Sequence, residues 1–277
     1  GKIYVDGIDM GNFNSTNTGT KTLVGARWNA EIQEAENHFS GWIEEVRIWE
    51  PAISVDQIRF MMNQRLYNNG TQMGVEIPMN VPNGLSYTHL AGYYQLLADP
   101  ALVANGTTPD LALNSIPGRL VNMETFQENT APLPYTSRID GQNWATDNTW
   151  THFNVWDAPN SNGINGAPID WNIVRTSHNI NSGNKNIRLL GLNSETGKLD
   201  IFNPSGTHNE TNSGQYVSIS HYLKLDGSID LTGESQLLQD IGSIVDASSS
   251  GYLERDQQGT ANSYNYNYWS FPVSAGV

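Results

Sequence analysis

The sequence predicts an all-β protein, and three observations support this. Its apolar residues occur in short alternating runs that end in turn residues, as in residues 2–5, which are followed by Asp6 and Gly7. Asparagine and glycine are abundant, with 32 and 26 of the 277 residues. Charged residues make up 15% of the chain, whereas an average domain has about 25%. Turns are therefore more numerous than charged helical faces.

Charge and composition exclude several classes of protein. The chain has 14 basic and 28 acidic side chains, a net charge of -14, and its basic residues are scattered, which disfavours nucleic-acid binding. No apolar run approaches the roughly 18–20 residues of a membrane span. The absence of cysteine excludes disulfides, thiolate zinc sites and thiol nucleophiles. The chain opens without Met or a signal-peptide pattern, so we expect it to be part of a longer protein.

Residues 1–66 carry short strands and one helix. Residues 22–27 and 41–49 continue the strand rhythm. Ser54 and Gln57 form a capping-box pattern and predict a helix that begins after Ser54. The apolar face expected for this helix consists of Val55, Ile58, Met62 and Leu66.

This segment resembles the second half of a laminin-G-like, concanavalin-type jelly roll. The similarity rests on G-K-I-Y-V-D-G at residues 1–7, L-V-G-A at 23–26, and F-S-G-W-I-E-E-V-R-I-W with P-A-I-S-V-D-Q-I at 39–58. It implies a partial jelly roll with one short helix over residues 1–66. The first half of that jelly roll would then lie before Gly1 or in another chain.

Residues 67–135 are rich in proline and asparagine and are expected to form a connector. Residues 90–96 within it resemble the opening strand of a second, truncated laminin-G-like unit. Residues 136–277 form a β-rich region that we expect to continue beyond the fragment. Apolar pairs recur every six residues from Val217 to Leu237, which favours a β-solenoid. A hairpin turning at Asp226 and Gly227 stays open as the alternative.

Residues 120–277 also resemble a block found in very large secreted Bacteroidota proteins. The similarity is carried by I-D-W-N-I-V-R-T-S-H-N-I at 169–180, L-K-L-D-G-S-I-D-L-T-G-E-S-Q-L-L-Q at 223–239 and G-Y-L-E-R at 251–255. It implies export by the type IX secretion system, an extracellular, cell-surface location and an adhesin-like role. The translocon and its shuttle proteins are then expected partners during export, and gliding motility is one physiological setting.

The acidic and imidazole groups are not arranged for catalysis. Glu44 and Glu45 are neighbours on opposite faces of a predicted strand, and Glu50 lies about 20 Å along it from Glu44, so no pair has the spacing of a glycosidase. The six histidines form no close metal-binding pair, and neither a G-x-S-x-G elbow nor a phosphate loop occurs. We therefore expect no catalytic residues.

Two binding sites are conceivable. Asp157 and Asn160 could contribute oxygen ligands to an irregular calcium site, although the surrounding residues do not fit the helix-loop-helix calcium motif. Trp144, Trp150 and Trp156 recur every six residues and could form a platform for sugar rings, with packing inside the protein as the simpler explanation.

The sequence thus predicts a non-catalytic fragment of a large cell-surface adhesin that contacts surface glycans or proteins. The alternative is a polysaccharide-binding accessory module of a secreted enzyme. A third alternative is a passenger of purely structural value that makes no selective contact.

Overall fold

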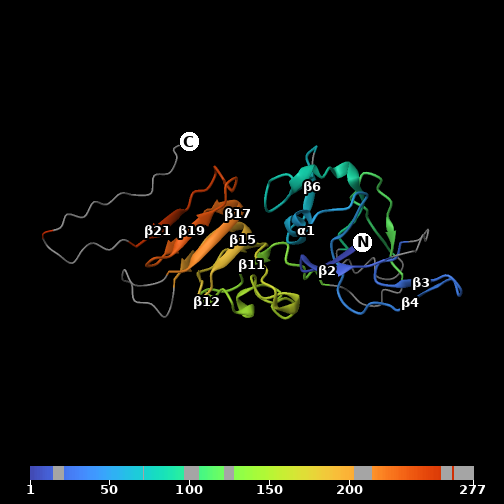
Figure 1. Ribbon diagram of the computed structural model, residues 1–277, viewed down its shortest axis with the longest axis horizontal. Coiled ribbons are helices and arrows are strands. Elements are labelled where there is room, and N and C mark those ends of the chain that lie inside the picture. Colours follow the sequence, from blue (N-terminus) through green and yellow to red (C-terminus); the bar gives the residue numbers. More distant parts are fainter. Residues whose placement is uncertain are drawn as a thin grey trace. The chain divides into compact units, whose positions relative to one another are not determined.

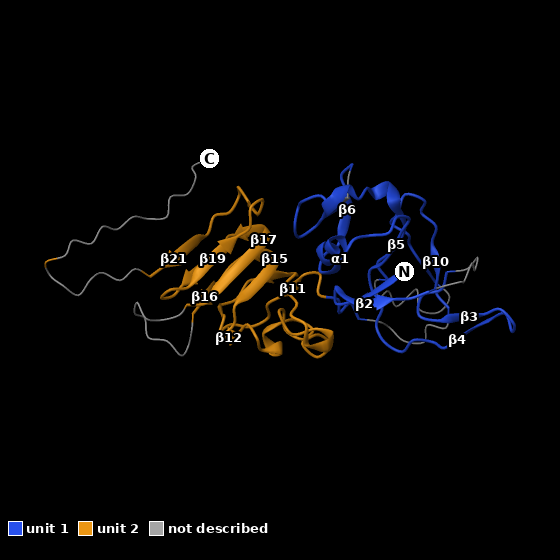
Figure 2. Ribbon diagram, in the orientation of Figure 1, with its two compact units in different colours: residues 1–131 blue, residues 132–277 orange. Residues whose placement is uncertain are grey.

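A computed structural model describes residues 1–14, 22–70, 72–96, 106–121, 128–202, 214–256 and 264 (Figure 1). The chain divides into two compact units, residues 1–131 and residues 132–277 (Figure 2). The described residues are mostly in strands and turns, with one α-helix, as the composition predicts. No helix among them is both long and apolar enough to cross a membrane.

The first unit is built from antiparallel strand pairs. Its described strands form five two-stranded sheets, which pair β1 with β2, β3 with β4, β5 with β8, β6 with β7 and β9 with β10. The strands are β1 Lys2–Val5, β2 Ile8–Asn12, β3 Arg27–Asn29, β4 Glu34–Glu36, β5 Val46–Trp49, β6 Leu66–Asn68, β7 Gln72–Gly74, β8 Leu90–Tyr94, β9 Thr107–Thr108 and β10 Gly118–Arg119.

The expected partial jelly roll is wrong. A jelly roll packs two multi-stranded antiparallel sheets, and the described part of this unit has no sheet of more than two strands. The strand predicted over residues 41–49 is shortened to β5 because Glu45 adopts a φ of 56°. This left-handed conformation ends the alternation of side chains. The pairing of β5 with β8 also joins part of the predicted connector to the segment that precedes it.

Helix α1 (Val55–Met62) begins where its capping box predicts. The Gln57 amide donates to Ser54 Oγ at 3.3 Å, and the Ser54 amide donates to Gln57 Oε1 at 2.8 Å. The buried side chains of the helix are Gln57, Phe60 and Met61. The helical residues of the predicted apolar face, Val55, Ile58 and Met62, are only half-buried. Gln57 is turned inward instead, and its side chain donates to the Pro82 carbonyl at 2.8 Å.

The second unit contains two larger sheets whose neighbouring strands run parallel. In what we call the first sheet the order is β11-β13-β15-β17-β19, with β20 also paired to β17, and in the second sheet it is β12-β14-β16-β18-β21. The strands are β11 Tyr135–Thr136, β12 Gln142–Asn143, β13 Asn172–Thr176, β14 Ile180–Asn181, β15 Ile187–Ser194, β16 Lys198–Ile201, β17 Tyr216–Leu225, β18 Ser228–Leu231, β19 Gln236–Gln239, β20 Ile244–Val245 and β21 Tyr252–Arg255.

The chain alternates between these sheets, so that each pass stacks in parallel on the one before it (Figure 1). This connectivity is that of a β-solenoid, and it agrees with the parallel alternative predicted for this region. The residues in register in the first sheet are Val174, Leu192, Leu223 and Val245, so successive coils are unequal in length. The hairpin alternative is wrong, because Asp226 and Gly227 link β17 of the first sheet to β18 of the second.

The six-residue spacing therefore separates successive apolar pairs within one coil, and it is not the number of residues in a coil. Two of the apolar pairs, at 217/219 and 223/225, lie on the same strand β17, and a register shift opposite Leu189 and Gly191 separates them. The next pair lies on β18, beyond the corner at Asp226 and Gly227. Each pair points into the core, and each interval contains a kink or a turn.

The core of the second unit is a cluster of apolar side chains, most of which come from the strands of the two sheets. The buried members are Trp144, Trp150, Ala158, Val174, Ile180, Ile187, Leu189, Leu192, Leu199, Ile201, Val217, Ile219, Leu223, Leu225, Ile229 and Leu231. Residues of one kind lie in register on neighbouring strands, as Leu199 and Ile229 do. Because every coil buries its apolar residues only against its neighbours, the stack is stabilised coil by coil.

A turn after β20 holds a strongly bonded carboxylate. Ser248 donates to Asp246 Oδ1 from its hydroxyl at 2.5 Å and from its amide at 2.7 Å, and the Tyr222 hydroxyl donates to Oδ2. These hydrogen bonds, those from Ser248 first, favour the charged form and lower the pKa of Asp246 from 3.8 to about 2.

Candidate functional site

The three tryptophans proposed as a sugar platform lie in different environments. Trp144 is 0% and Trp150 is 1% exposed, and their rings meet edge to face with centroids 4.8 Å apart. Trp150 Nε1 donates to the Trp144 carbonyl at 3.0 Å. Both rings belong to the core and offer no face to a ligand. Trp156 is 39% exposed, so the predicted platform is reduced to one ring.

The two residues proposed as calcium ligands lie in different settings. Asp157 is exposed, whereas the Asn160 side chain is used within the fold. Asn160 Oδ1 accepts from Trp144 Nε1 at 3.1 Å, and Nδ2 donates to the Ile169 carbonyl at 3.0 Å. The Asn160 carbonyl accepts from Lys185 Nζ at 3.0 Å, so an ammonium group already occupies this acceptor. No group of three or more His, Cys, Asp or Glu side chains that could hold a metal ion occurs within the described ranges.

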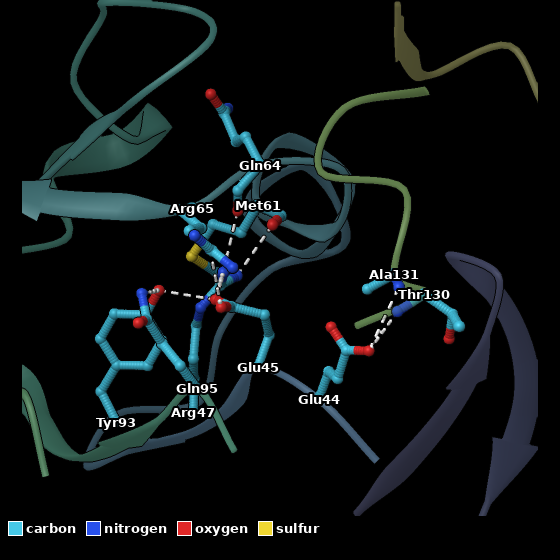
Figure 3. Close-up of polar contacts among 10 residues, drawn as sticks. All are labelled: Glu44, Glu45, Arg47, Met61, Gln64, Arg65, Tyr93, Gln95, Thr130 and Ala131. Atoms are coloured by element: carbon cyan, nitrogen blue, oxygen red, sulfur yellow. Dashed lines mark hydrogen bonds and ion pairs between the residues drawn. The ribbon is translucent and has the colours of Figure 1, made fainter. Parts of the chain in front are cut away.

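The glutamates considered for catalysis diverge (Figure 3). Glu44 Oε1 accepts from the backbone amides of Thr130 at 2.5 Å and Ala131 at 3.4 Å. Glu45 points the other way, into a group of polar side chains from other elements. Glu50 is exposed. The positive φ of Glu45 separates the first two carboxylates, and each closes a different set of structural contacts.

The Glu45 carboxylate is the centre of a buried ionic cluster. Arg47 Nη2 approaches Glu45 Oε2 at 2.6 Å, Arg65 Nε approaches Oε1 at 3.3 Å, and the Tyr93 hydroxyl donates to Oε2 at 2.6 Å (Figure 3). The side chains of Glu45 and Arg47 are 8% and 9% exposed. Burial is the main reason why the pKa of Tyr93 is raised, which keeps its hydroxyl a donor.

This cluster has a structural explanation. Arg47 also donates to the carbonyls of Met61 and Gln64, each at 2.8 Å, at the end of α1. These carbonyls lack partners inside a helix, and a cation there also interacts favourably with the helix dipole. Both oxygens of Glu45 are occupied by groups of the protein itself. We therefore assign the cluster to holding α1 against β5 and β8 rather than to chemistry.

A serine–histidine pair that sequence reasoning missed has a similar role. Ser137 Oγ lies 2.9 Å from His178 Nδ1 and accepts from the Ser177 amide at 2.9 Å. Ser137 is 3% exposed, so its oxygen is not presented to a substrate. A serine nucleophile needs an accessible oxygen beside its base, and this pair lacks that access. It ties neighbouring coils of the second unit together.

The corner between the two sheets of the second unit is a better candidate for a binding surface than the groups described above. Three glycines, Gly197, Gly227 and Gly251, occupy the same place in successive coils, immediately before β16, β18 and β21. A Cβ added to Gly227 would lie 2.6 Å from the Gly197 carbonyl oxygen, and one added to Gly251 would lie closer still to that of Gly227. The close approach of the coils therefore requires glycine at these three positions.

Two rows of side chains project outward beside this corner. Leu199 and Ile229 face the core, so their neighbours on the same strands face outward. One row consists of Lys198, Ser228 and Tyr252, and the other of Asp200, Asp230 and Glu254, each in register across β16, β18 and β21. We call the surface formed by these two rows and the three glycines the corner face.

An open hollow of about 440 Å³ lies in the corner face. Its lining residues are Asn179, Thr196, Gly197, Lys198, Asp226, Gly227, Ser228, Tyr252 and Glu254. Ser228 is 5% exposed and lies between the larger side chains of Lys198 and Tyr252, while Tyr252 is 60% exposed. A small residue between two large ones, beside bare glycines, produces the depression.

Opposite charges meet at the edge of the hollow. Lys198 Nζ lies 2.8 Å from Asp230 Oδ2 and 3.7 Å from Glu254 Oε2, and its hydrogen bond to Asp230 raises the pKa of Lys198. Backbone hydrogen bonding from Ser250 lowers the pKa of Asp226. Lys198 and Asp226 are therefore both held in their charged forms, and the acidic side chains around the hollow outnumber the basic one.

The sequence does contain a signal for this face. Gly197-Lys-Leu-Asp-Ile, Gly227-Ser-Ile-Asp-Leu and Gly251-Tyr-Leu-Glu-Arg share the pattern glycine, variable, aliphatic, acidic. The three copies are unequally spaced along the chain, and this hides them from a search for a fixed period.

In comparisons with known proteins, no protein-family model, curated protein or solved structure matches the chain.

Proposed function

We propose that this chain is a non-catalytic recognition module of a cell-surface, adhesin-type protein, and that the corner face of the second unit is its contact surface. The observation that carries the proposal is the registration of two outward rows across three stacked coils. Parallel stacking places equivalent side chains about 4.8 Å apart on a packed support. Such a surface is held in one geometry before a partner binds, which lowers the entropic cost of binding.

The acidic groups support binding rather than bond cleavage. Glu45 is neutralised by two arginines, and Asp230 is paired with Lys198. General acid–base catalysis by a carboxyl pair needs one group held protonated and one ionised, with room for a substrate between them. Glu44 and Glu45, which adjoin in sequence, turn to separate backbone and side-chain partners instead.

The location rests on the sequence. The resemblance of residues 120–277 to blocks of large secreted Bacteroidota proteins supports an extracellular position, export by the type IX system and contact with its translocon and shuttle proteins. Surface attachment, including attachment during gliding, is the proposed setting. The hollow with its exposed Tyr252 favours a second candidate function, that of a polysaccharide-binding accessory module of a secreted enzyme.

A binding experiment with the immobilised chain tests the proposal directly. It is presented to arrays of glycans and to extracts of cell-surface proteins, and the same polysaccharides are assayed for release of reducing ends. We expect selective retention on at least one array without release of product. Cleavage of a polymer that a single Glu45→Gln or Asp230→Asn replacement abolishes would overturn the non-catalytic assignment. If neither the glycans nor the surface proteins are selectively retained, only the third alternative is left, a passenger of purely structural value.

A further inference from the structure

We propose that the hollow over Ser228 is a subsite for one ring of an uncharged saccharide, with the ring stacked on Tyr252. This inference deepens the proposed function, on which it rests, because it gives the corner face a ligand class and a location. Tyr252 supplies the only exposed aromatic ring among the residues that line the hollow.

The spacing of the strands fits one sugar ring. Lys198 and Tyr252 stand on the two strands that flank β18, so their backbones lie about 9–10 Å apart, which is two strand spacings. A ring in contact with the tyrosine face lies about 3.5–4 Å from it, which places the ring over Ser228. About 5–6.5 Å then remains between the ring and the line of β16, so the long Lys198 side chain must lean towards the ring to donate a hydrogen bond to it. The hollow therefore accommodates a single layer.

The groups around the hollow include both hydrogen-bond donors and hydrogen-bond acceptors. Asn179 Nδ2, the Ser228 hydroxyl and the Tyr252 hydroxyl have no hydrogen-bond partner within the described residues, although Asn179 Oδ1 accepts from the Lys198 amide at 3.0 Å. Among the described residues, the Glu254 carboxylate makes a single polar contact, in which its Oε2 lies 3.7 Å from Lys198 Nζ. Sugar hydroxyls both donate and accept, so they match donors and a carboxylate together.

The charges select against anionic ligands. Lys198 is the only basic residue that lines the hollow, and Asp230 and Glu254 both lie within ion-pair distance of it. Asp226 adds a further carboxylate, and the whole chain carries a net charge of -14. A phosphate, sulfate or uronate would face repulsion here. An aliphatic ligand would remove water from the charged groups without replacing its hydrogen bonds. An uncharged saccharide avoids both costs.

Titration of the 277-residue chain with neutral oligosaccharides, built from glucose, galactose, mannose or N-acetylglucosamine and chosen from an array, tests the subsite. We expect Tyr252→Ala to weaken binding of the best of them at least tenfold, because it removes the stacking face. Tyr252→Phe keeps that face and should stay within about threefold. Asn179→Asp should weaken binding severalfold, because it replaces a donor with a carboxylate. Tyr252 is exposed, and circular dichroism checks that each variant is folded.

Trp156→Ala is the matched control, since Trp156 is an exposed aromatic of the same unit that does not line the hollow. It should bind as the unchanged chain does. Glycan binding that survives Tyr252→Ala, that Trp156→Ala abolishes, or that prefers sulfated over neutral oligosaccharides would overturn the subsite and leave the proposed function intact. Failure to bind any glycan or surface protein would overturn both.

Discussion

Replacement of Gly227 by alanine tests the close stacking of the coils at the corner. The new Cβ would lie 2.6 Å from the Gly197 carbonyl oxygen, 2.8 Å from Ser194 Oγ and 3.0 Å from the Thr196 carbonyl carbon. Ordinary contacts of a Cβ begin at 3.4 Å, so the nearest atom must move by about 0.8 Å. Two of the three neighbours are backbone atoms of the preceding coil and cannot rotate away.

The cost follows from the bonds that this movement stretches. The Ser228 amide donates to the same Gly197 oxygen at 3.0 Å, and the Gly227 amide donates to the Ser194 carbonyl at 2.9 Å. Loss of these two bonds costs about 1 kcal/mol each, and residual overpacking costs about 1 kcal/mol more. Alanine stabilises the folded state by about 0.4–1 kcal/mol because it restricts the unfolded chain. The net loss is about 2–3 kcal/mol.

Calorimetry measures this loss as a lower melting temperature of the second unit. A loss of about 2–3 kcal/mol corresponds to a shift of about 5–10 °C for a unit of this size. Gly141→Ala is the control, because Gly141 has a φ of +72° and no atom within 4 Å of its added Cβ, so only the backbone cost of about 1 kcal/mol applies. A Gly227→Ala variant no less stable than this control would refute the argument.

Three further measurements test other parts of the structure. Glu45→Gln should destabilise the first unit by about 3 kcal/mol in urea unfolding, because Arg47 stays buried without its charged partner, and a neutral effect would show that the cluster is solvated. The lowered pKa of Asp246 adds stability that is fully present above pH 3.8 and is lost as the pH falls towards 2. Asp246→Asn should therefore cost up to about 1 kcal/mol at pH 7, after allowance for solvent screening, and the difference in stability from the unchanged chain should shrink as the pH falls from 3.8 through about 2; a difference that is the same at pH 7 and at pH 2 would contradict this. Trp150→Ala should cost about 3–5 kcal/mol by calorimetry and Trp156→Ala less than about 1 kcal/mol, because only the first ring is in the core, and similar losses would contradict the assigned burial.

The local features of the fold could be predicted from the sequence. The capping box at Ser54 and Gln57 placed the start of α1, and alternation placed many of the strands. Whether neighbouring strands pair in parallel or antiparallel could not be predicted from the sequence in the same way. Strand β18 alternates equally well in a hairpin and in a parallel coil, and its true partners, β16 and β21, belong to the coils before and after it. The mistaken jelly roll followed from the same limit, together with the unforeseen left-handed turn at Glu45.

The candidate site was hidden for a different reason. Trp144 and Trp150 drew attention by residue type and spacing, but the structure uses both to fill the core. Tyr252 stands in a short segment with little to distinguish it until Gly251 is aligned with Gly197 and Gly227. Contacts between coils create the hollow, and no single segment carries that information.

The two outward rows cross three coils, and this has a mechanical consequence. A ligand that touches Lys198 on β16 and Tyr252 on β21 spans β18 between them, so it acts as a brace across layers that otherwise hold only their immediate neighbours. A pulling force applied to β21 would load the layers in series, and an occupied face would slow the separation of β21 from β18. Amide protons of β21 should then exchange more slowly when the face is occupied, so attachment and resistance to tension would be properties of one surface.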